Sequence, residues 1–352
     1  MSNVRVLMIG AGRDVRGGVS SVVNSYYEAG LDTMCELTYL PTMEDGSKLR
    51  KMFVAAGARL SFERLVRRCD ILHVHMSSDN SFYRKAMFIR KAYKEKRKII
   101  IHMHGSTFDL FYKERCNDRQ KQEVRDIFAM ADAVIALSED WKAFLAGHIC
   151  KEEKIQVLYN AVPLPEAFEK DYHSREILFL GRLGQRKGTY DLIEALPELL
   201  RQYPDAHVYF GGDGERDRAE GLCRERGIAD RVTFVGWVRG AEKERLLKTC
   251  SIYALPTYHE GMPMSVLEAM SYGMAVISTY TGGIPHIITD GKNGLLCQAG
   301  DREALKELLA QALSSHERRK ELGMEARAVI AERFDVHGNL EKLTALYDRL
   351  RA

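Results

Sequence analysis

Cations and glycines stand close together in the segment Gly181–Gly188. Arg182 and Lys187 lie in this segment, which follows the predicted strand Glu176–Leu180 and precedes a predicted helix that begins near Thr189. Glycine lets the backbone come close to a ligand, and a helix N-terminus favours an anion. We therefore predict a diphosphate-binding loop that needs neither a metal nor a cofactor. The alternative is a basic turn that only faces solvent.

A second segment, Glu260–Glu268, carries two carboxylates eight residues apart and follows the predicted strand Ser251–Leu255. A carboxylate in such a loop can accept hydrogen bonds from sugar hydroxyls. Backbone N–H groups of Gly261 to Met264 would face the ligand if the next helix starts at Ser265. Glu268 also has a structural explanation, because Ser265 and Glu268 match the S-x-x-E capping box. Glu260 has no such explanation.

The N-terminal half contains two H-x-H pairs, His73-Val74-His75 and His102-Met103-His104, at the ends of predicted strands. Alternate residues of a strand share a face, so each pair presents two imidazoles together. One interpretation is a metal site with Asp79 or Asp109 as a further ligand, although no spaced set of carboxylates completes it. The other is that His73 and His102 are core histidines. His104, next to Gly105, is then the better site candidate.

Glycines also surround the first predicted helix, as Gly10-Ala11-Gly12 and Gly17-Gly18. Their spacing is not G-x-G-x-x-G, and no acidic residue ends the second strand, so a nicotinamide cofactor is not expected. Gly17 and Gly18 at a helix N-terminus still suit a phosphate or a sugar. A third glycine pair, Gly282-Gly283, follows the predicted strand Ala275–Ser278 and again permits close approach of the backbone.

Short apolar strands alternate with helices along the whole chain. Strands are predicted at Val4–Ile9, Leu37–Leu40, Ile71–His75, Lys98–His102, Ala133–Leu137, Ile155–Leu158, Glu176–Leu180, Ala206–Gly211, Val232–Val235, Ser251–Leu255, Ala275–Ser278 and Gly294–Leu296. Helices are predicted at Gly18–Glu28, Phe82–Lys96, Asp118–Met130, Thr189–Arg201, Arg216–Arg226, Glu242–Lys248, Ser265–Tyr272, Arg302–Ser314, His316–Arg333 and Asp335–Ala352. This alternation predicts parallel sheets covered by helices on both faces.

The series of strands occurs twice, so we expect an α/β chain with two Rossmann-like domains whose sheets face a central cleft. The Pro-containing polar segment from Pro163 to Ser174 marks the break between them. We predict an acceptor-binding domain over residues 1–165 and a nucleotide-binding domain over 174–334. The last helix, 335–352, is expected to pack back toward the N-terminal domain.

The charge of the chain is unevenly distributed. The whole chain has a net charge of +3, but residues 48–98 hold 15 basic and 4 acidic residues, a net of +11. The same stretch holds large apolar side chains, among them Phe53, Leu60 and Met87. One interpretation is two helices that dock on anionic lipid, and the other is two helices packed on a sheet with their cations in water. No nucleic-acid-binding module accompanies the charge, so nucleic acid is not an expected partner.

The seven cysteines form no C-x-x-C pair, which favours reduced thiols in a cytoplasmic protein over a disulfide or zinc framework. The first residues enter a strand directly, so no signal peptide is expected. We therefore expect a cytoplasmic protein, with the inner face of the cell membrane as a peripheral location.

Taken together, these segments resemble glycosyltransferase family 4, which has the two-domain glycosyltransferase B fold. The resemblance covers nearly the whole chain and rests on Gly17-Gly18, His104-Gly105, Ser138-Glu139, Asn160, Gly181–Gly188, Glu260–Glu268, Gly282-Gly283 and Asn293-Gly294. It implies transfer of a sugar from a nucleotide-diphosphate donor with retention at the anomeric carbon and without a metal. One position departs from the family, because His286 stands where G-G-x-x-E usually has its glutamate.

The resemblance also implies roles for individual residues. Arg182 and Lys187 would hold the donor diphosphate, Glu268 the ribose and Glu260 the hydroxyls of the donor sugar. The candidate catalytic residues are His104, Arg182, Lys187 and Glu260, and the candidate donor-binding residues are Gly17, Gly18, Gly181, Arg182, Lys187, Glu260, Gly261, Met262, Pro263, Met264, Ser265 and Glu268.

The expected acceptor is a saccharide, lipid-linked if the basic stretch binds membrane, in the synthesis of a cell-surface polysaccharide. Three other functions stay open at this point. They are a sugar-nucleotide epimerase of the same fold, a metal-dependent hydrolase that uses the H-x-H pairs, and a sugar-nucleotide sensor that binds without turnover.

Overall fold

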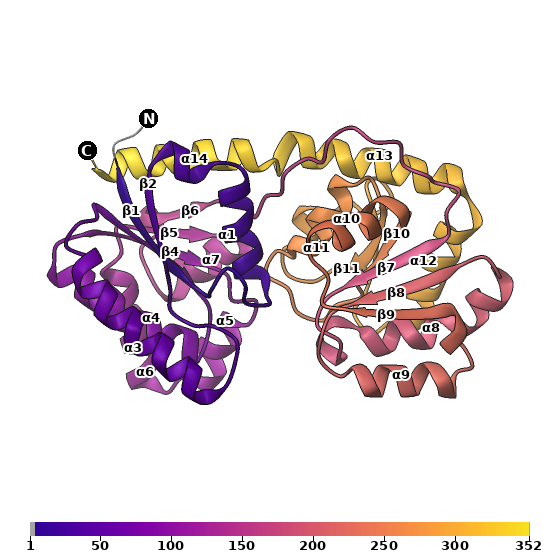
Figure 1. Cartoon of the computed structure of the whole chain (residues 1–352), viewed down its shortest axis with the longest axis horizontal. Helices are drawn as coiled ribbons and strands as arrows, with labels where there is room; N and C mark the ends of the chain where they lie inside the picture. The colour runs from indigo at the N-terminus through magenta and orange to yellow at the C-terminus, as the bar shows by residue number, and fades with distance from the viewer. Residues whose placement is uncertain (1–3, 352) are drawn as a thin grey trace. The chain divides into compact units, whose positions relative to one another are not determined.

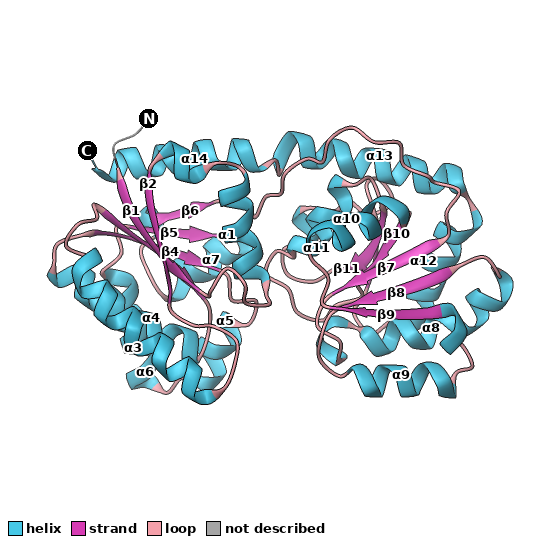
Figure 2. Cartoon of the chain, in the orientation of Figure 1, coloured by secondary structure: helices cyan, strands magenta, loops and turns pink. Residues whose placement is uncertain are grey.

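The computed structural model describes residues 4–351, apart from the side chains of Lys48, Leu49, Lys51 and Met52. The chain forms two compact units (Figure 1). The first comprises the chain up to Ala161 together with the segment from Val336 onward, and the second comprises Val162–Asp335. Each unit contains a six-stranded parallel sheet with helices on both sides (Figure 2).

The sheet of the first unit has the strand order β2-β1-β3-β4-β5-β6. Its strands are β1 (Arg5–Gly10), β2 (Glu36–Pro41), β3 (Ile71–Met76), β4 (Lys98–Met103), β5 (Ala133–Ala136) and β6 (Ile155–Val157). Its helices are α1 (Gly18–Glu28), α2 (Leu31–Met34), α3 (Lys48–Leu65), α4 (Asn80–Lys94), α5 (Phe108–Leu110), the π-helix η1 (Phe111–Arg115), α6 (Asp118–Ala129), α7 (Glu139–His148), the 3-10 turn η2 (Glu152–Lys154) and α14 (Val336–Arg351). The central strand β3 is buried along its whole length, including its two histidines, His73 and His75.

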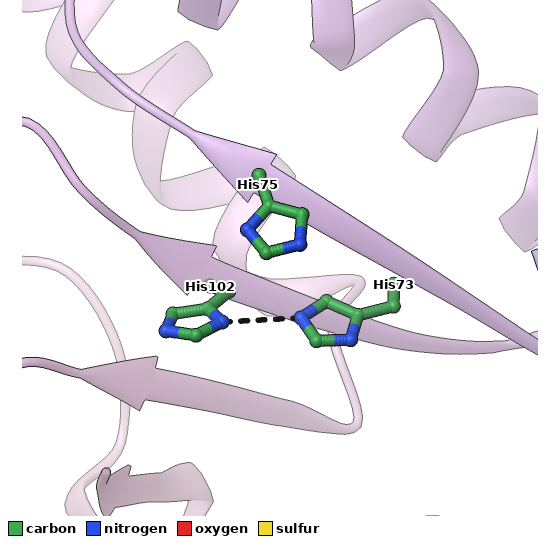
Figure 3. Close-up of side chains that lie close together, drawn as sticks. All are labelled: His73, His75 and His102. Carbon is green, nitrogen blue, oxygen red and sulfur yellow. Dashed lines mark hydrogen bonds between the residues drawn. The ribbon is translucent and has the colours of Figure 1, made fainter. Parts of the chain in front are cut away.

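The last helix, α14, contributes to the first unit from the far end of the sequence. It contacts α1 and β3. The Tyr347 hydroxyl lies 2.6 Å from Nδ1 of His73, and Asn339 donates a 2.6 Å hydrogen bond to the carbonyl of Tyr159. His73 in turn lies beside His75 and His102 in the core (Figure 3). Tyr347 therefore completes a polar cluster whose histidines come from β3 and β4.

The sheet of the second unit has the strand order β12-β11-β10-β7-β8-β9. Its strands are β7 (Glu176–Leu180), β8 (His207–Gly211), β9 (Val232–Gly236), β10 (Ile252–Ala254), β11 (Ala275–Thr279) and β12 (Leu295–Cys297). Its helices are α8 (Thr189–Gln202), α9 (Arg216–Glu225), α10 (Gly240–Thr249), α11 (Met264–Ser271), α12 (Arg302–Ser314) and α13 (His316–Arg333), with the 3-10 turns η3 (Gln185–Lys187), η4 (Ala229–Arg231) and η5 (Ile284–His286).

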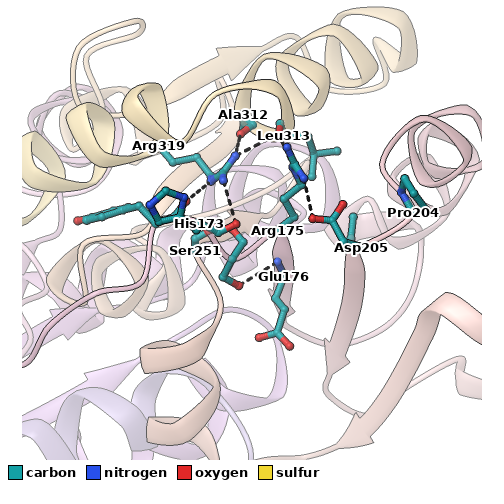
Figure 4. Close-up of polar contacts among 12 residues, drawn as sticks. His173, Arg175, Glu176, Pro204, Asp205, Ser251, Ala312, Leu313 and Arg319 are labelled. Atoms are coloured by element: carbon teal, nitrogen blue, oxygen red, sulfur yellow. Dashed lines mark hydrogen bonds and ion pairs between the residues drawn. The ribbon is translucent and has the colours of Figure 1, made fainter.

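A buried guanidinium fixes the segment that leads into this second sheet. Arg319 is 1% exposed and donates hydrogen bonds to the carbonyls of Tyr172 and Ala312 at 2.9 and 2.6 Å (Figure 4). Arg175, beside it, pairs with Asp205 at 2.6 Å. The stretch 163–174, expected as the break between domains, therefore lies within the second unit and is held by α13.

The twelve predicted strands are confirmed, each within one residue at either end. The ten predicted helices are confirmed within two residues at each described end, and Ala352, the predicted last residue of the final helix, lies outside the described residues. The agreement has a simple origin, because each strand is a short apolar run bounded by polar or glycine residues. The parallel α/β fold predicted from the sequence is therefore confirmed.

Candidate functional site

Lys187 and Glu260 bring the two predicted ligand loops of the second unit together. Lys187 ends η3, which follows β7, and Glu260 lies between β10 and α11. Because β7 and β10 are parallel neighbours, their carboxyl ends meet at one edge of the sheet. Lys187 Nζ donates a hydrogen bond to Glu260 Oε1, and the two side chains are only 13% and 7% exposed. The sequence-predicted cation and carboxylate thus form a buried ion pair.

Backbone and hydroxyl contacts hold the same two loops in register. The carbonyl of Arg186 accepts a 2.9 Å hydrogen bond from the Tyr258 N–H and lies 3.0 Å from the hydroxyl of Thr257. That hydroxyl also lies 3.1 Å from Glu260 Oε1. Arg186 returns a 3.1 Å hydrogen bond from its guanidinium to the carbonyl of His259. The Glu260 carboxylate therefore has a fixed position in the ligand-free chain.

Asp191 anchors the Glu260 loop to the helices behind it. Its carboxylate is almost fully buried in the first turn of α8 and accepts a 2.8 Å hydrogen bond from the Tyr258 hydroxyl. Arg302, at the start of α12, donates a 2.7 Å hydrogen bond to the other oxygen of Asp191. Burial and the hydrogen bond to Asp191 together raise the pKa of Tyr258. Sequence analysis missed this anchor, because no short motif links residues so far apart.

The glycine pair after β11 lies against the Glu260 loop. The N–H of Gly283 donates a 2.7 Å hydrogen bond to the carbonyl of Gly261. Gly282 has a φ of 54°, and a Cβ atom there would come within 1.8 Å of the carbonyl oxygen of Glu260. Only glycine fits this position without displacing the loop. His286, the departure from the family pattern, follows in η5 and is partly buried.

Arg182 differs from Lys187 in its surroundings, since its side chain is exposed. The Gly181 N–H before it bonds to the carbonyl of Gly211 at 2.9 Å, which fixes the loop at the end of β7. Within the described residues Arg182 forms neither a hydrogen bond nor an ion pair, although its charge lowers the pKa of Glu215 after the larger contributions of Tyr190 and Arg218. Its guanidinium is thus available to an anion.

The capping box expected for Glu268 is wrong. Helix α11 begins at Met264 with Pro263 as its N-cap and has no side-chain cap, so Ser265 is already inside the first turn. The hydroxyl of the nearby Tyr253 donates a 3.1 Å hydrogen bond to the carbonyl of Leu180, and burial is the main cause that raises the pKa of this tyrosine. Glu268 is free of a capping role and pairs with Lys243 at 2.8 Å. The backbone of residues 261–264 therefore leads into a helix that starts one residue earlier than predicted.

The candidates in the first unit are Gly17, Gly18 and His104. Gly17 caps α1 with a φ of 152°, and a Cβ atom on Gly17 or Gly18 would meet nothing within 4 Å. Open space therefore surrounds the start of α1, as an approaching ligand would need. His104 follows β4, is partly buried, and its Nε2 lies 2.8 Å from Nδ1 of His75.

The two H-x-H pairs do come together. One nitrogen from each of His73, His75 and His102 lies within 4.8 Å of the others. Burial lowers the pKa of His73 to about 3 and holds those of His75 and His102 well below the usual value, so all three imidazoles are neutral at pH 7. Neutral imidazoles of this kind can ligate a metal, but they are also the core histidines that the sequence suggested for His73 and His102.

Asp79, proposed as a further ligand of that metal, is used elsewhere. Both of its carboxylate oxygens accept hydrogen bonds from Arg115 Nη1 at 3.0 Å. His73 is bonded to Tyr347 and to His102, the latter at 3.2 Å (Figure 3). Among the described residues no carboxylate joins the histidine cluster, so the interpretation as a metal hydrolase loses the carboxylate ligand that it assumed.

Comparison with known proteins adds two family matches in succession. Residues 26–166 match the model of Glycosyltransferase Family 4, and residues 163–329 match that of Glycosyl transferases group 1. The second match spans both loops that carry Lys187 and Glu260. Together the two matches cover the chain from residue 26 to residue 329.

Curated relatives share this similarity over part of their length. The N-acetyl-alpha-D-glucosaminyl L-malate synthase of Bacillus anthracis is 26% identical over 80% of this chain and 74% of its own. The lipopolysaccharide core biosynthesis glycosyltransferase LpsE of Rhizobium meliloti is 29% identical over 50% of this chain and 49% of its own. In several other matches the aligned region likewise covers only between 41% and 60% of the relative's own length.

A solved structure shares the fold along the whole chain. It is Anabaena HepE in complex with UDP and glucose, which is 17% identical and superposes with a TM-score of 0.79 over 99% of this chain and all of that one. At this identity the likeness concerns the fold.

Proposed function

Since the chain belongs to the glycosyltransferases of family 4 and group 1, we propose that it transfers a sugar from a nucleotide-diphosphate sugar to a saccharide acceptor, with retention and without a metal. The contact between Lys187 and Glu260 carries this proposal. A cation for the diphosphate and a carboxylate for the sugar hydroxyls meet where parallel strands end. The N–H groups of Met262, Met264 and Ser265 at the start of α11 would add donors beside them.

Charge explains how these groups would promote the reaction. Cleavage of the bond between the anomeric carbon and phosphate leaves an extra negative charge on the departing diphosphate. Arg182, which has no counter-ion among the described residues, and Lys187 would stabilise that charge in place of a metal. When the diphosphate takes Lys187, Glu260 is released to accept hydrogen bonds from the sugar. A phosphate oxygen of the donor would receive the acceptor proton, so no strong general base is required.

The remaining candidates have supporting roles in this proposal. Glu268 would bind the ribose after exchanging its pairing with Lys243. The family resemblance would also assign His104 to the donor sugar and Gly17 and Gly18 to the diphosphate. The open space around Gly17 and Gly18 supports the second assignment.

The acceptor is proposed to be a saccharide of a cell-surface polysaccharide, carried on a lipid. The name of the LpsE relative supports the polysaccharide, and the exposed surface of α3 and α4 supports the lipid. Phe53 and Leu60 on α3 are 76% and 77% exposed, and Met87 and Tyr93 on α4 are 49% and 56% exposed. Arginines and lysines surround them, a combination typical of peripheral attachment to anionic lipid. The described helices include none that is both long and apolar enough to span a bilayer.

A donor screen tests the central proposal. Thermal unfolding would be measured with a panel of nucleotide-diphosphate sugars, since a bound ligand raises the Tm. Transfer to polysaccharide-type acceptors and retention would then be followed by NMR with the donor that binds. Arg182→Ala combined with Lys187→Ala should abolish transfer, whereas Arg201→Ala, which removes an exposed cation at the end of α8, should not. Near-normal transfer by the double variant, or release of an epimerised donor without acceptor, would overturn the proposal.

A further inference from the structure

Two adjacent cations on α4 are buried without a counter-ion. Lys85 is 2% exposed, and its Nζ donates a 2.9 Å hydrogen bond to the hydroxyl of Ser81. Arg84 is partly buried, and its Nε is shielded from solvent with no hydrogen-bond partner. Across the part of the chain that the structure describes, no carboxylate pairs with either side chain. Other cations of the same helix are paired, as Arg90 is with Glu123 at 2.6 Å.

These cations lie where ligands of parallel sheets bind. Ser81 belongs to the first turn of α4, so the Lys85 ammonium reaches back toward the start of the helix, just after β3 ends. The loop between β3 and α4 packs against the end of β4, because a Cβ atom on Gly105 would come within 3.1 Å of the Ser78 N–H. The charge of Lys85 also lowers the pKa values of His75 and His104, after the larger effect of burial.

The acidic residue at the start of α4, the N-cap Asp79, is already paired with Arg115. The first turn of the helix contains no acidic residue, and Asp79 makes no side-chain cap because its carboxylate is turned to Arg115. A buried cation is costly unless it is paired, and two neighbouring ones repel each other. Burial, with a smaller contribution from Arg84, lowers the pKa of Lys85 to about 7. An anion bound at the start of α4 would pair with both cations. It would offset the cost of burying their charges and their mutual repulsion.

We propose that Lys85, Arg84 and Ser81 bind a phosphate or diphosphate group of the acceptor. The anion site is inferred from the buried charges alone. Its assignment to the acceptor rests on the proposed function. Ser81 and Arg84 are partly exposed and would contact the anion directly, with the Lys85 ammonium behind them. Two sources share this chemistry, a polyprenyl diphosphate that carries a saccharide and a soluble sugar phosphate.

Inorganic diphosphate is the probe, and isothermal titration of the full chain is the measurement. The donor site is first disabled with Arg182→Ala, Lys187→Met and Glu260→Gln, so that diphosphate can bind only elsewhere. In this background we expect saturable binding that Lys85→Met weakens about tenfold or more, the usual weight of a hydrogen-bonded ion contact. Lys94→Met, which removes an exposed lysine of the same helix, is the matched control and should bind as the background does.

Lys85→Met should also unfold at the same or a higher temperature than its background when no anion is present, because it removes an unpaired buried charge. Arg84→Gln provides a second variant, in which the buried Lys85 side chain is kept. Saturable binding retained by both Lys85→Met and Arg84→Gln, or none in the background, would overturn the site. A hexose 1-phosphate and a short-chain polyprenyl diphosphate in micelles, used as competitors, identify the source by which of them displaces the probe. Because the readout is binding with the donor site disabled, a failure here leaves the proposed transfer reaction untouched.

Discussion

Lys187 and Glu260 are 73 residues apart in the sequence and joined by a hydrogen-bonded ion pair in the structure. The pair closes the gap between two loops that end neighbouring strands. Each of the two side chains has its partner within the chain, so the proposed donor would have to exchange this pairing for contacts with its diphosphate and its sugar.

The buried pair should be strongly coupled in stability. Lys187→Met leaves the Glu260 carboxylate buried without a cation, and the expected loss is about 3–5 kcal/mol. Adding Glu260→Gln removes the stranded charge and should recover most of that loss. Urea unfolding of the parent, both single variants and the double variant measures the coupling. Strictly additive losses would show that the two side chains are not paired in solution.

Glycine at position 282 should be required for the position of Glu260. In Gly282→Ala the new methyl group meets the Glu260 carbonyl, so we expect a lower Tm and at least a tenfold loss of kcat/KM, equivalent to about 1.4 kcal/mol. Gly291→Ala is the matched control. Gly291 has a similarly positive φ of 74° but open space around it, so it carries the backbone strain without the collision. Equal effects of the two substitutions on kcat/KM would argue against the close contact.

The first unit should lose stability in acid because of its buried histidines. Burial lowers the pKa values of His73 and His104 to about 3, whereas in the unfolded chain they titrate near 6.5. Between these values the unfolded chain binds more protons, so stability is intact above pH 6.5 and falls as the pH drops toward 3. Hydrogen exchange of the β3 and β4 backbone amides, measured as a function of pH, tests this expected loss of stability.

Two variants separate this effect from general acid unfolding. His102→Gln removes one buried imidazole and should reduce the dependence on pH, whereas His316→Asn changes a histidine of the second unit whose side chain is 42% exposed, and should not. An unchanged pH dependence in His102→Gln would contradict the assignment.

The exposed apolar residues of α3 should bind lipid. Phe53→Ser with Leu60→Ser is expected to reduce recovery with anionic vesicles in a flotation assay, because two apolar side chains no longer enter the interface. High salt should weaken the binding of the parent chain by screening its arginines and lysines. Met324→Ser, which alters a 58% exposed residue of the second unit, is the control. Equal recovery with neutral and anionic vesicles at low salt would defeat the electrostatic part of this proposal.

Local pattern alone predicted the elements of both sheets and the loops that hold the candidate residues. Apolar runs of strand length and the glycines that follow them are properties of neighbouring residues, so they can be read in order along the chain. The same local reasoning failed at Ser265. The S-x-x-E pattern fits a capping box, but Pro263 is the N-cap of α11, so Ser265 already lies inside the first turn and cannot cap the helix.

The sequence by itself determined which residue types stand at the carboxyl ends of the strands, because the alternation of strands and helices makes the strands parallel, so that their carboxyl ends share one side of each sheet. Only the tertiary structure decided which of them meet. The pairing of Lys187 with Glu260, the anchoring of Tyr258 by Asp191, the contact of Tyr347 with His73 and the burial of Lys85 without a carboxylate all join or isolate side chains from separate elements. Such contacts depend on how strands align and helices pack, and neither is encoded in the spacing of any one motif.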